Sequence, residues 1–285
     1  MNKRKLNFSD VYRQILAKTE EYLLKNNIKT VVDPISGGLD SGLTAAILSK
    51  ICKKNNIKLV GRYIHIESNK QEEQDRAEMI GKAFCDDFKS LDLTPLYNVS
   101  LGIYEEGAEI ANPSYADKIR RGNIKARMRM IHAFNLSSQY ERGLVIDNDN
   151  MTEHLLGFWT LNGDVGTLTP LASLFKTEVF ELAKYMVNDV LTDSAEKAAL
   201  VAVIEAVPTD GLGITSSDVE QFGAKSYDEV DDILMTILGY VPEVTVTDIE
   251  ELSKKYTKET VDKVIKRHEN SEFKRNCPYR IHVDI

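Results

Sequence analysis

The strongest constraint on this 285-residue chain is a short loop that joins a buried apolar segment to an amphipathic helix. Residues 30–35 have the composition of a short buried strand, and residues 42–54 place apolar side chains on one helical face. Between them, residues 36–41 read Ser-Gly-Gly-Leu-Asp-Ser. The glycines let the backbone approach an anion, and the helix N-terminus offers N–H groups and a positive dipole end. The pattern predicts a phosphate-binding loop.

This loop differs from the common phosphate loop Gly-x-x-x-x-Gly-Lys-Ser/Thr, because it has no lysine and it contains Asp40. A carboxylate beside phosphates is unfavourable unless a divalent cation joins the two. The sequence therefore predicts that Asp40 is a magnesium ligand. The alternative is an ordinary tight turn between a strand and a helix, without a ligand.

Apolar runs and helical patterns alternate through the first half of the chain. Short strands are expected at 58–66, 91–93 and 143–146, and helices at 71–84 and from Asp117 to about Tyr140. Strands that alternate with helices of this length indicate βαβ units. We therefore expect an α/β fold with a doubly wound parallel sheet flanked by helices.

The chain becomes helical beyond Pro170, with patterns around 179–186, 227–238 and 247–268. The last of these begins with a capping-box pattern, Thr247-x-x-Glu250. No linker separates these helices from the rest, so we expect residues 1–285 to form one domain with a helical C-terminal elaboration. Residues 206–226 lack periodicity and are predicted to form a lid, and residues 270–285 a C-terminal tail.

Composition narrows the function classes. The chain has 36 Lys+Arg against 44 Asp+Glu, a formal net charge of −8, which disfavours broad nucleic-acid binding. No apolar run reaches the roughly 18 residues of a membrane helix, and the basic N-terminus lacks the apolar stretch of a secretory signal. The three cysteines have no short spacing. We expect a cytoplasmic protein that binds neither membrane nor nucleic acid.

Further polar residues suggest a site beside the loop. Asn123 and Arg127 are i, i+4 neighbours on an unusually basic helix, although a solvated basic face would look the same. Glu153 and Asp164 follow a strand end, where α/β sheets bind ligands. Lys176 begins a helix, where the macrodipole disfavours a cation, so an anion nearby would offset its placement. Taken singly, each could be a surface charge.

The loop resembles the pyrophosphate loop of the ATP pyrophosphatases, Ser-Gly-Gly-x-Asp-Ser. With the segments 122–130, 153–176, 208–209, 227–233 and 271–278, nearly the whole chain resembles the ammonia-dependent NAD synthetases. This resemblance implies the adenine nucleotide α-hydrolase-like fold. It also implies a carbon–nitrogen ligase that amidates deamido-NAD with ammonia through an adenylated intermediate, forming NAD, AMP and pyrophosphate. The chain has no room for the glutaminase domain of glutamine-dependent members, so free ammonia is expected.

The resemblance also implies roles for matched residues. Asp40, Asp164 and Lys176 would be catalytic, with Asp164 holding ammonium or accepting its proton. Asp40 and Glu153 would bind Mg²⁺, and the protein would be a homodimer with deamido-NAD at the subunit interface. The residues implied in ATP binding are Ser36, Gly37, Gly38, Asp40, Ser41, Asn148, Lys176 and Thr209, and those implied in deamido-NAD binding are Asn123, Arg127, Asp164 and Lys274.

Several positions depart from the family pattern, and they concentrate on the walls of the nucleotide pocket. The family usually has Gly-Thr at Asp147-Asn148 and Arg-Leu-Pro-Tyr-Gly at 64–68, and Leu161 and Phe273 replace a familiar Lys and His. Two alternatives follow from these departures. One is a related ATP-pyrophosphatase amide ligase with a different substrate. The other is a catalytically silent dinucleotide-binding dimer, against which the retained carboxylates argue.

Overall fold

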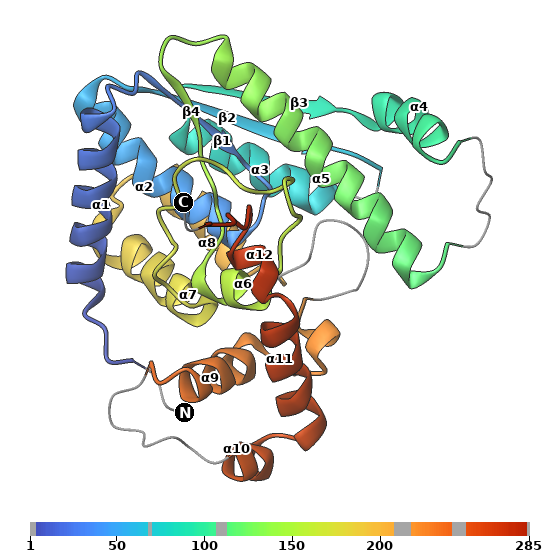
Figure 1. Cartoon of the computed structure of the whole chain (residues 1–285). Coiled ribbons are helices and arrows are strands. Elements are labelled where there is room, and N and C mark those ends of the chain that lie inside the picture. Colours follow the sequence, from blue (N-terminus) through green and yellow to red (C-terminus); the bar gives the residue numbers. More distant parts are fainter. Residues whose placement is uncertain (1–3, 68–69, 107–112, 208–217, 241–248, 284–285) are drawn as a thin grey trace.

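A four-stranded parallel sheet lies at the centre of the molecule, in the strand order β3-β2-β1-β4 (Figure 1). The computed structural model describes residues 4–67, 70–106, 113–207, 218–240 and 249–283. The strands are β1 (Thr30–Pro34), β2 (Lys58–His65), β3 (Asp87–Asp92) and β4 (Gly143–Val145). All three strand pairs are parallel. This arrangement confirms the predicted doubly wound α/β fold.

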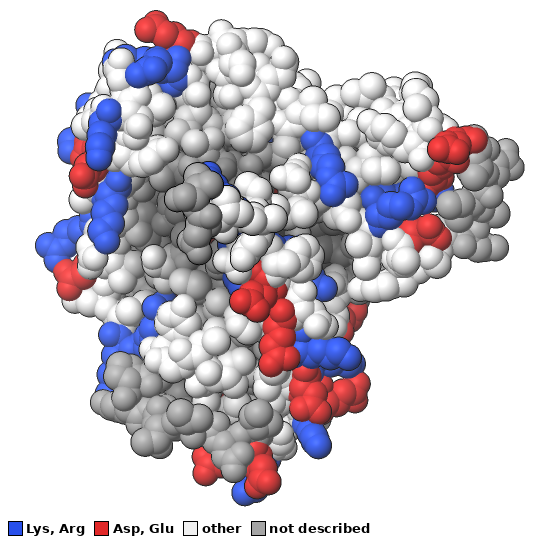
Figure 2. Space-filling model, in the orientation of Figure 1, with Lys and Arg blue, Asp and Glu red and all other residues white. Residues whose placement is uncertain are grey.

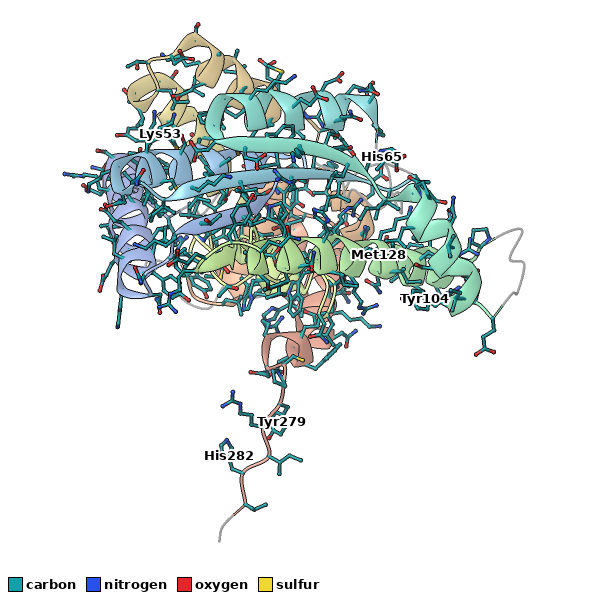
Figure 3. All side chains as sticks on the ribbon, turned by 90° about the horizontal axis from the view of Figure 1, so that it is seen from above. Lys53, His65, Tyr104, Met128, Tyr279 and His282 are labelled. Atoms are coloured by element: carbon teal, nitrogen blue, oxygen red, sulfur yellow. The ribbon has the colours of Figure 1, made fainter. Side chains whose placement is uncertain are left out.

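Helices cover both faces of the sheet, as the view from above shows (Figure 3). Side chains alternate along a strand, so Val31 packs toward α2 (Leu39–Asn55) and α3 (Gln71–Phe84), while Val32 packs toward α5 (Tyr115–Ser138). The central strands β1 and β2 are therefore buried on both faces, as parallel strands usually are, whereas the edge strand β3 is polar and partly exposed. The carboxyl ends of the strands are left to form a site.

A second apolar cluster holds the C-terminal helices together below the sheet (Figure 1). Its core includes Leu156, Phe175, Ile233 and Val261. The remaining elements of the chain are α1 (Phe8–Lys25), α4 (Thr94–Tyr104), α6 (Met151–Leu156), α7 (Lys176–Tyr185), a π-helical turn Met186–Val190, α8 (Ser194–Ile204), a 3-10 turn Asp218–Phe222, α9 (Tyr227–Ile237), α10 (Ile249–Lys255), α11 (Lys258–Asn270) and α12 (Glu272–Arg275). The elaboration thus packs on the sheet domain through α6 and α7.

Some predicted boundaries were wrong, because capping groups and tertiary contacts override the local pattern. The long helix α5 begins after Ser114, earlier than the predicted Asp117. The Ser114 hydroxyl accepts the N–H of Asp117, which is the third residue of a capping box. The helix expected over 247–268 is two helices, since Thr257 caps a new helix. Thr247 lies outside the described residues.

Two more differences concern β3 and α4. The third strand covers Asp87–Asp92, earlier than the predicted 91–93, since its partner strand β2 sets its register through the pair Val60–Asp87. Helix α4 was not predicted, and it begins with Pro95 at a first-turn position. Most of the predicted lid, residues 208–217 with Thr209, lies outside the described residues. No described helix is long and apolar enough to cross a membrane.

Candidate active site

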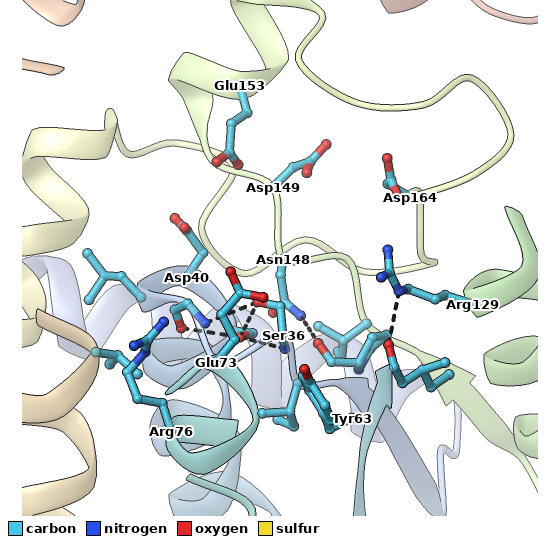
Figure 4. A pocket seen from close by; sticks show the side chains of 18 of the residues that line it. Ser36, Asp40, Tyr63, Glu73, Arg76, Arg129, Asn148, Asp149, Glu153 and Asp164 are labelled. Carbon is cyan, nitrogen blue, oxygen red and sulfur yellow. Dashed lines mark hydrogen bonds between the residues drawn. The ribbon is translucent and has the colours of Figure 1, made fainter. Parts of the chain in front are cut away.

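A cavity lined by both polar and apolar side chains opens at the carboxyl ends of β1, β2 and β4 (Figure 4). The loop 36–41, the end of β2, α5, the segment 146–153 and the start of α7 all contribute to its walls. This is the edge at which open α/β sheets bind ligands. Ser36, Asp40, Glu153, Asp164 and Lys176, predicted from separate parts of the sequence, all line this one cavity.

The loop 36–41 is held open by its own hydroxyl groups. The Ser36 N–H donates to Ser41 Oγ (3.1 Å), and the two serine Oγ atoms lie 3.0 Å apart. Gly37 has a φ of +81°, and a Cβ there would lie 2.1 Å from the carbonyl oxygen of Glu73 on α3. Only glycine fits at Gly37, because the close packing of α3 and the left-handed backbone both exclude a side chain.

Lys176 joins the two predicted metal ligands. Its ammonium donates to the carboxylate of Asp40 and to Glu153 Oε1, and the distance from Lys176 Nζ to Glu153 Oε1 is 3.1 Å. Asn150 was not predicted, yet its side chain donates to Asp40 Oδ1 (2.8 Å) and accepts the N–H of Glu153 (3.1 Å). Asn150 is the N-cap of α6 in a capping box with Glu153, a pattern visible in the sequence. It thus orients both carboxylates.

This cluster holds more negative than positive charge. Burial raises the pKa of Glu153 to about 7, with Lys176 opposing the rise and Asp40 adding to it. Burial also raises the pKa of Asp149, which faces the same cavity, and the charge of Glu153 raises it further. For Lys176, burial works against the charged form, but Asp40 and Glu153 outweigh it and raise the pKa. The cluster of carboxylates is therefore suited to a further cation.

Asp231, on α9, fixes the beginning of α7 and so the position of Lys176. The buried carboxylate accepts the hydroxyl hydrogen of Thr152 and the N–H of Thr177 (2.8 Å), and Thr152 Oγ1 accepts the N–H of Lys176 (2.9 Å). A carboxylate at a helix N-terminus is favourable, which offsets the lysine there. Sequence reasoning missed Asp231, because it is 54 residues from Thr177.

Asp164 and Arg129 lie on the side of the cavity away from the loop (Figure 4). Asp164 accepts the N–H of Thr160 (2.7 Å), and burial raises its pKa. Arg129 donates through Nε to the carbonyl of Ile64 (3.2 Å), and its guanidinium extends toward Asp164. Arg129 had no predicted role, although it lies two residues from Arg127 on the same basic helix.

The predicted residues Gly38, Ser41 and Asn148 also line the cavity, but three others lie outside it. Asn123 accepts the hydroxyl hydrogen of Thr160 (2.8 Å), and Arg127 donates to the carbonyl of Leu161 (3.1 Å). Neither side chain lines the cavity. Lys274 donates to the carbonyl oxygens of Gly157 (2.7 Å) and Trp159. These three residues hold the turn 157–164, which carries Asp164.

Comparison with protein families matches residues 11–278 to the family described as NAD synthase. The chain belongs to the NAD synthase family. It is 30% identical over 232 residues to an NH(3)-dependent NAD(+) synthetase of Finegoldia magna, covering 81% of this chain and 86% of the relative. It is 28% identical over 281 residues to the corresponding synthetase of Fusobacterium nucleatum, covering 98% and 97%.

Solved structures of the same fold support this assignment of architecture. The NH3-dependent NAD synthetase of Campylobacter jejuni matches with a TM-score of 0.70 at 19% identity, covering 97% of this chain and all of that one. An NMN synthetase of Francisella tularensis matches with a TM-score of 0.74, also at 19% identity, covering 99% of both chains. At this identity the two structures establish the fold of this NAD synthase family member, not its substrate.

Proposed function

We propose that this chain is an ammonia-dependent NAD synthetase that uses ATP to convert the nicotinate carboxylate of deamido-NAD to an amide. The observation that carries the proposal is the meeting of the loop 36–41 with Lys176, Glu153 and Asp164 around one cavity. The products are NAD, AMP and pyrophosphate. ATP is needed because a carboxylate resists attack by an amine until it carries a leaving group.

The residues around the loop support the first half-reaction. Ser36, Gly38 and Ser41 line the cavity and would bind the phosphates of ATP, whereas Gly37 packs against α3 and does not line it. Lys176 would offset the charge of the pyrophosphate as it leaves. The amide nitrogen of Asn148 does not donate to ATP, because it already donates to Asp33 Oδ1 (2.9 Å) and to the carbonyl of Pro34 (3.1 Å). Its Oδ1 is buried and has no hydrogen-bond partner among the described residues, so we assign Asn148 to holding the end of β1 rather than to a direct contact with ATP.

Asp40 and Glu153 fit a magnesium ion that the reaction would use. Their oxygens accept hydrogen bonds from the same ammonium, that of Lys176, and the excess of carboxylate in the cluster favours a divalent cation. Magnesium in such sites takes one or two carboxylates together with substrate phosphates. The bound ion would neutralise the developing charge on the pyrophosphate. Asn150 would hold both ligands in place.

Asp164 supports the second half-reaction. Its buried carboxylate lies across the cavity from the loop, where a small cation such as ammonium could be held beside the adenylated intermediate (Figure 4). The raised pKa makes Asp164 a better proton acceptor than an ordinary aspartate. Arg129 and Asp164 would flank the reacting carboxyl group.

We also propose a homodimer. The exposed side of α5 carries Tyr115, Ile119, Ile131 and Phe134 in a stripe that includes Arg127, and the side chain of Ile131 is 69% exposed. In Figure 2 the upper part of the surface over α5 is uncharged, and basic side chains lie over its lower part. A second copy packed on this stripe would bury it in an isologous interface and would bring Asn123 and Arg127 next to the partner. Deamido-NAD would then bind at the subunit interface.

We place the reaction in the cytoplasm. Cys52, Cys85 and Cys277 are all free, which is the usual state of cysteines in a reducing compartment. Burial raises the pKa of the Cys52 and Cys85 thiols, to about 12 for Cys52, so these two thiols are unreactive at neutral pH.

The proposal is tested by incubating the protein with ATP, Mg²⁺, ammonium and deamido-NAD, followed by mass detection of NAD and AMP. We expect equal amounts of the two products. A second arm replaces deamido-NAD with nicotinate mononucleotide, because the Francisella relative is named an NMN synthetase and the pocket wall departs from the family pattern at 64–68. AMP formation with the mononucleotide but not with deamido-NAD would contradict the proposal in favour of a related amide ligase. No AMP in either arm would favour the silent binding protein.

A further inference from the structure

Four cationic side chains line the described part of the cavity. Three of them lie beside a carboxylate. Arg62 pairs with Asp87 on β3 (3.1 Å), and Arg129 lies beside Asp164. Lys176 is paired with both Asp40 and Glu153. The fourth cation is Arg76, on α3.

Arg76 is held against the loop by the loop itself. Its Nε donates to the carbonyl oxygen of Gly37 (2.8 Å), at the point where α3 packs most closely on the loop. The side chain is partly buried and lines the same cavity as Ser36 and Asp40 (Figure 4). Among the described residues, no carboxylate lies within ion-pair distance of Arg76. The two terminal nitrogens of its guanidinium therefore keep their hydrogens for a ligand.

We propose that Arg76 is a phosphate-binding residue of the pyrophosphate site, in which its guanidinium donates to the β- and γ-phosphates of ATP and to released pyrophosphate. The inference rests on the proposed function, since it assumes that the loop 36–41 holds the phosphates of ATP. Guanidinium binds phosphate oxygens through two parallel N–H donors, and the bond to Gly37 fixes the direction in which they point.

The charge around the loop gives the physical reason for a cation at this place. Asp40, Glu153 and Lys176 together carry a net charge of −1 when all are ionised, and triphosphate adds several negative charges. Asp40 and Glu153 would hold a magnesium ion, which would offset part of this repulsion. Arg76 approaches the loop from α3, on the other side from α6 and α7, so that the phosphates would be held between two sources of positive charge.

Binding of magnesium pyrophosphate, measured by calorimetry on the full chain, tests the inference. Arg76→Gln removes the charge, Arg76→Lys keeps the charge without the two-pronged donor, and Lys82→Gln is the matched control, because Lys82 is an exposed residue of α3 paired with Glu78. We expect Arg76→Gln to weaken binding at least about tenfold, Arg76→Lys to weaken it less, and Lys82→Gln to leave it unchanged. Binding of deamido-NAD should be unaffected in all three.

A purely structural role of Arg76 predicts a different pattern. Both Arg76 variants would then lower the melting temperature alike, and the salt dependence of pyrophosphate binding would stay as steep as in the wild type. Under our proposal the salt dependence becomes shallower in Arg76→Gln, since one cation–phosphate contact is lost. If Arg76→Gln does not fold, the pyrophosphate affinity of Arg76→Lys tests the proposal instead. An unchanged pyrophosphate affinity in a folded variant overturns the proposal.

The outcome is separable from that of the proposed function. If the wild type forms NAD while Arg76→Gln binds pyrophosphate as tightly as the wild type, only the inference about Arg76 fails. If the wild type forms no NAD but its pyrophosphate binding depends on Arg76, the proposed reaction fails and the phosphate site stands.

Discussion

At the scale of single residues, Asp33 explains why this chain has Asn148 where the family usually has threonine. The Asp33 carboxyl is fully buried at the end of β1, where one oxygen accepts from Asn148 and the other has no hydrogen-bond partner among the described residues. Burial raises the pKa of Asp33 to about 7, and the bond from Asn148 opposes the rise. The asparagine at 148 thus serves a buried carboxyl that the sequence places 115 residues away.

Asp33→Asn should stabilise the fold in a pH-dependent way. Because the folded pKa lies above the unfolded value near 3.8, the wild type loses stability as pH rises from about 4 to about 7. The variant avoids this loss, so its gain in unfolding free energy should be near zero at pH 4 and reach up to about 4 kcal/mol at pH 8. Denaturant titrations at the two pH values measure it. An equal difference at both would show that Asp33 does not titrate in this range.

Asp164→Asn should separate the two half-reactions. The adenylated intermediate should still form, because Asp164 lies across the cavity from the loop, but its transfer to ammonia should slow by about 100-fold or more. Single-turnover quenching with mass detection of the intermediate measures both steps. An equal loss of adenylation would remove Asp164 from the ammonia site.

At the scale of elements, α7 begins with a lysine where the helix dipole disfavours one, and α9 supplies the compensation. Asp231 accepts hydrogen bonds from Thr152 on α6 and from the backbone of Thr177 on α7, so three helices meet at one carboxylate. The same contact places Lys176 between Asp40 and Glu153. The C-terminal elaboration is therefore part of the site, although it lies below the sheet in Figure 1.

Asp231→Ala should lower both stability and activity. It leaves the buried Thr152 hydroxyl and Thr177 N–H without their acceptor, which should cost about 2–4 kcal/mol of unfolding free energy. Since Lys176 loses its support, the rate of pyrophosphate release should fall by more than the folded fraction does. Asp262→Ala is the control, because Asp262 is exposed on the neighbouring helix α11. Loss of stability with a normal rate in the folded protein would limit Asp231 to a structural role.

At the scale of the whole molecule, the proposed homodimer makes the exposed stripe of α5 part of the substrate site. Ile131→Glu would place a charge in the buried interface and should convert the protein to a monomer with weakened deamido-NAD binding. Leu24→Glu is the matched control, since Leu24 is 53% exposed on α1, on the far side of the sheet domain (Figure 1). Sedimentation measures the oligomeric state. A wild-type monomer, or a dimer that survives Ile131→Glu, would rule out this interface.

The sequence by itself determined the fold class and the loop, because both follow from local patterns. Alternating apolar segments report which segments are buried, and Ser-Gly-Gly-Leu-Asp-Ser at the end of a strand reports an anion site without reference to distant residues. The local pattern predicted Asp40 as a magnesium ligand but left Glu153, Asp164 and Lys176 open to being surface charges. The resemblance to the NAD synthetases is what implied that these residues belong to one site.

Only the tertiary structure decided how these residues meet. Asp40 and Lys176 are 136 residues apart, and their contact depends on how α2 and α7 pack, which no local pattern encodes. The same holds for Asn150 and Asp231, whose importance comes from the carboxylate and helix end that they support, and for Arg76, whose direction comes from the close packing of α3 on Gly37. Side-chain partners across elements, burial and the resulting pKa shifts are set by packing, and packing is a property of the whole chain.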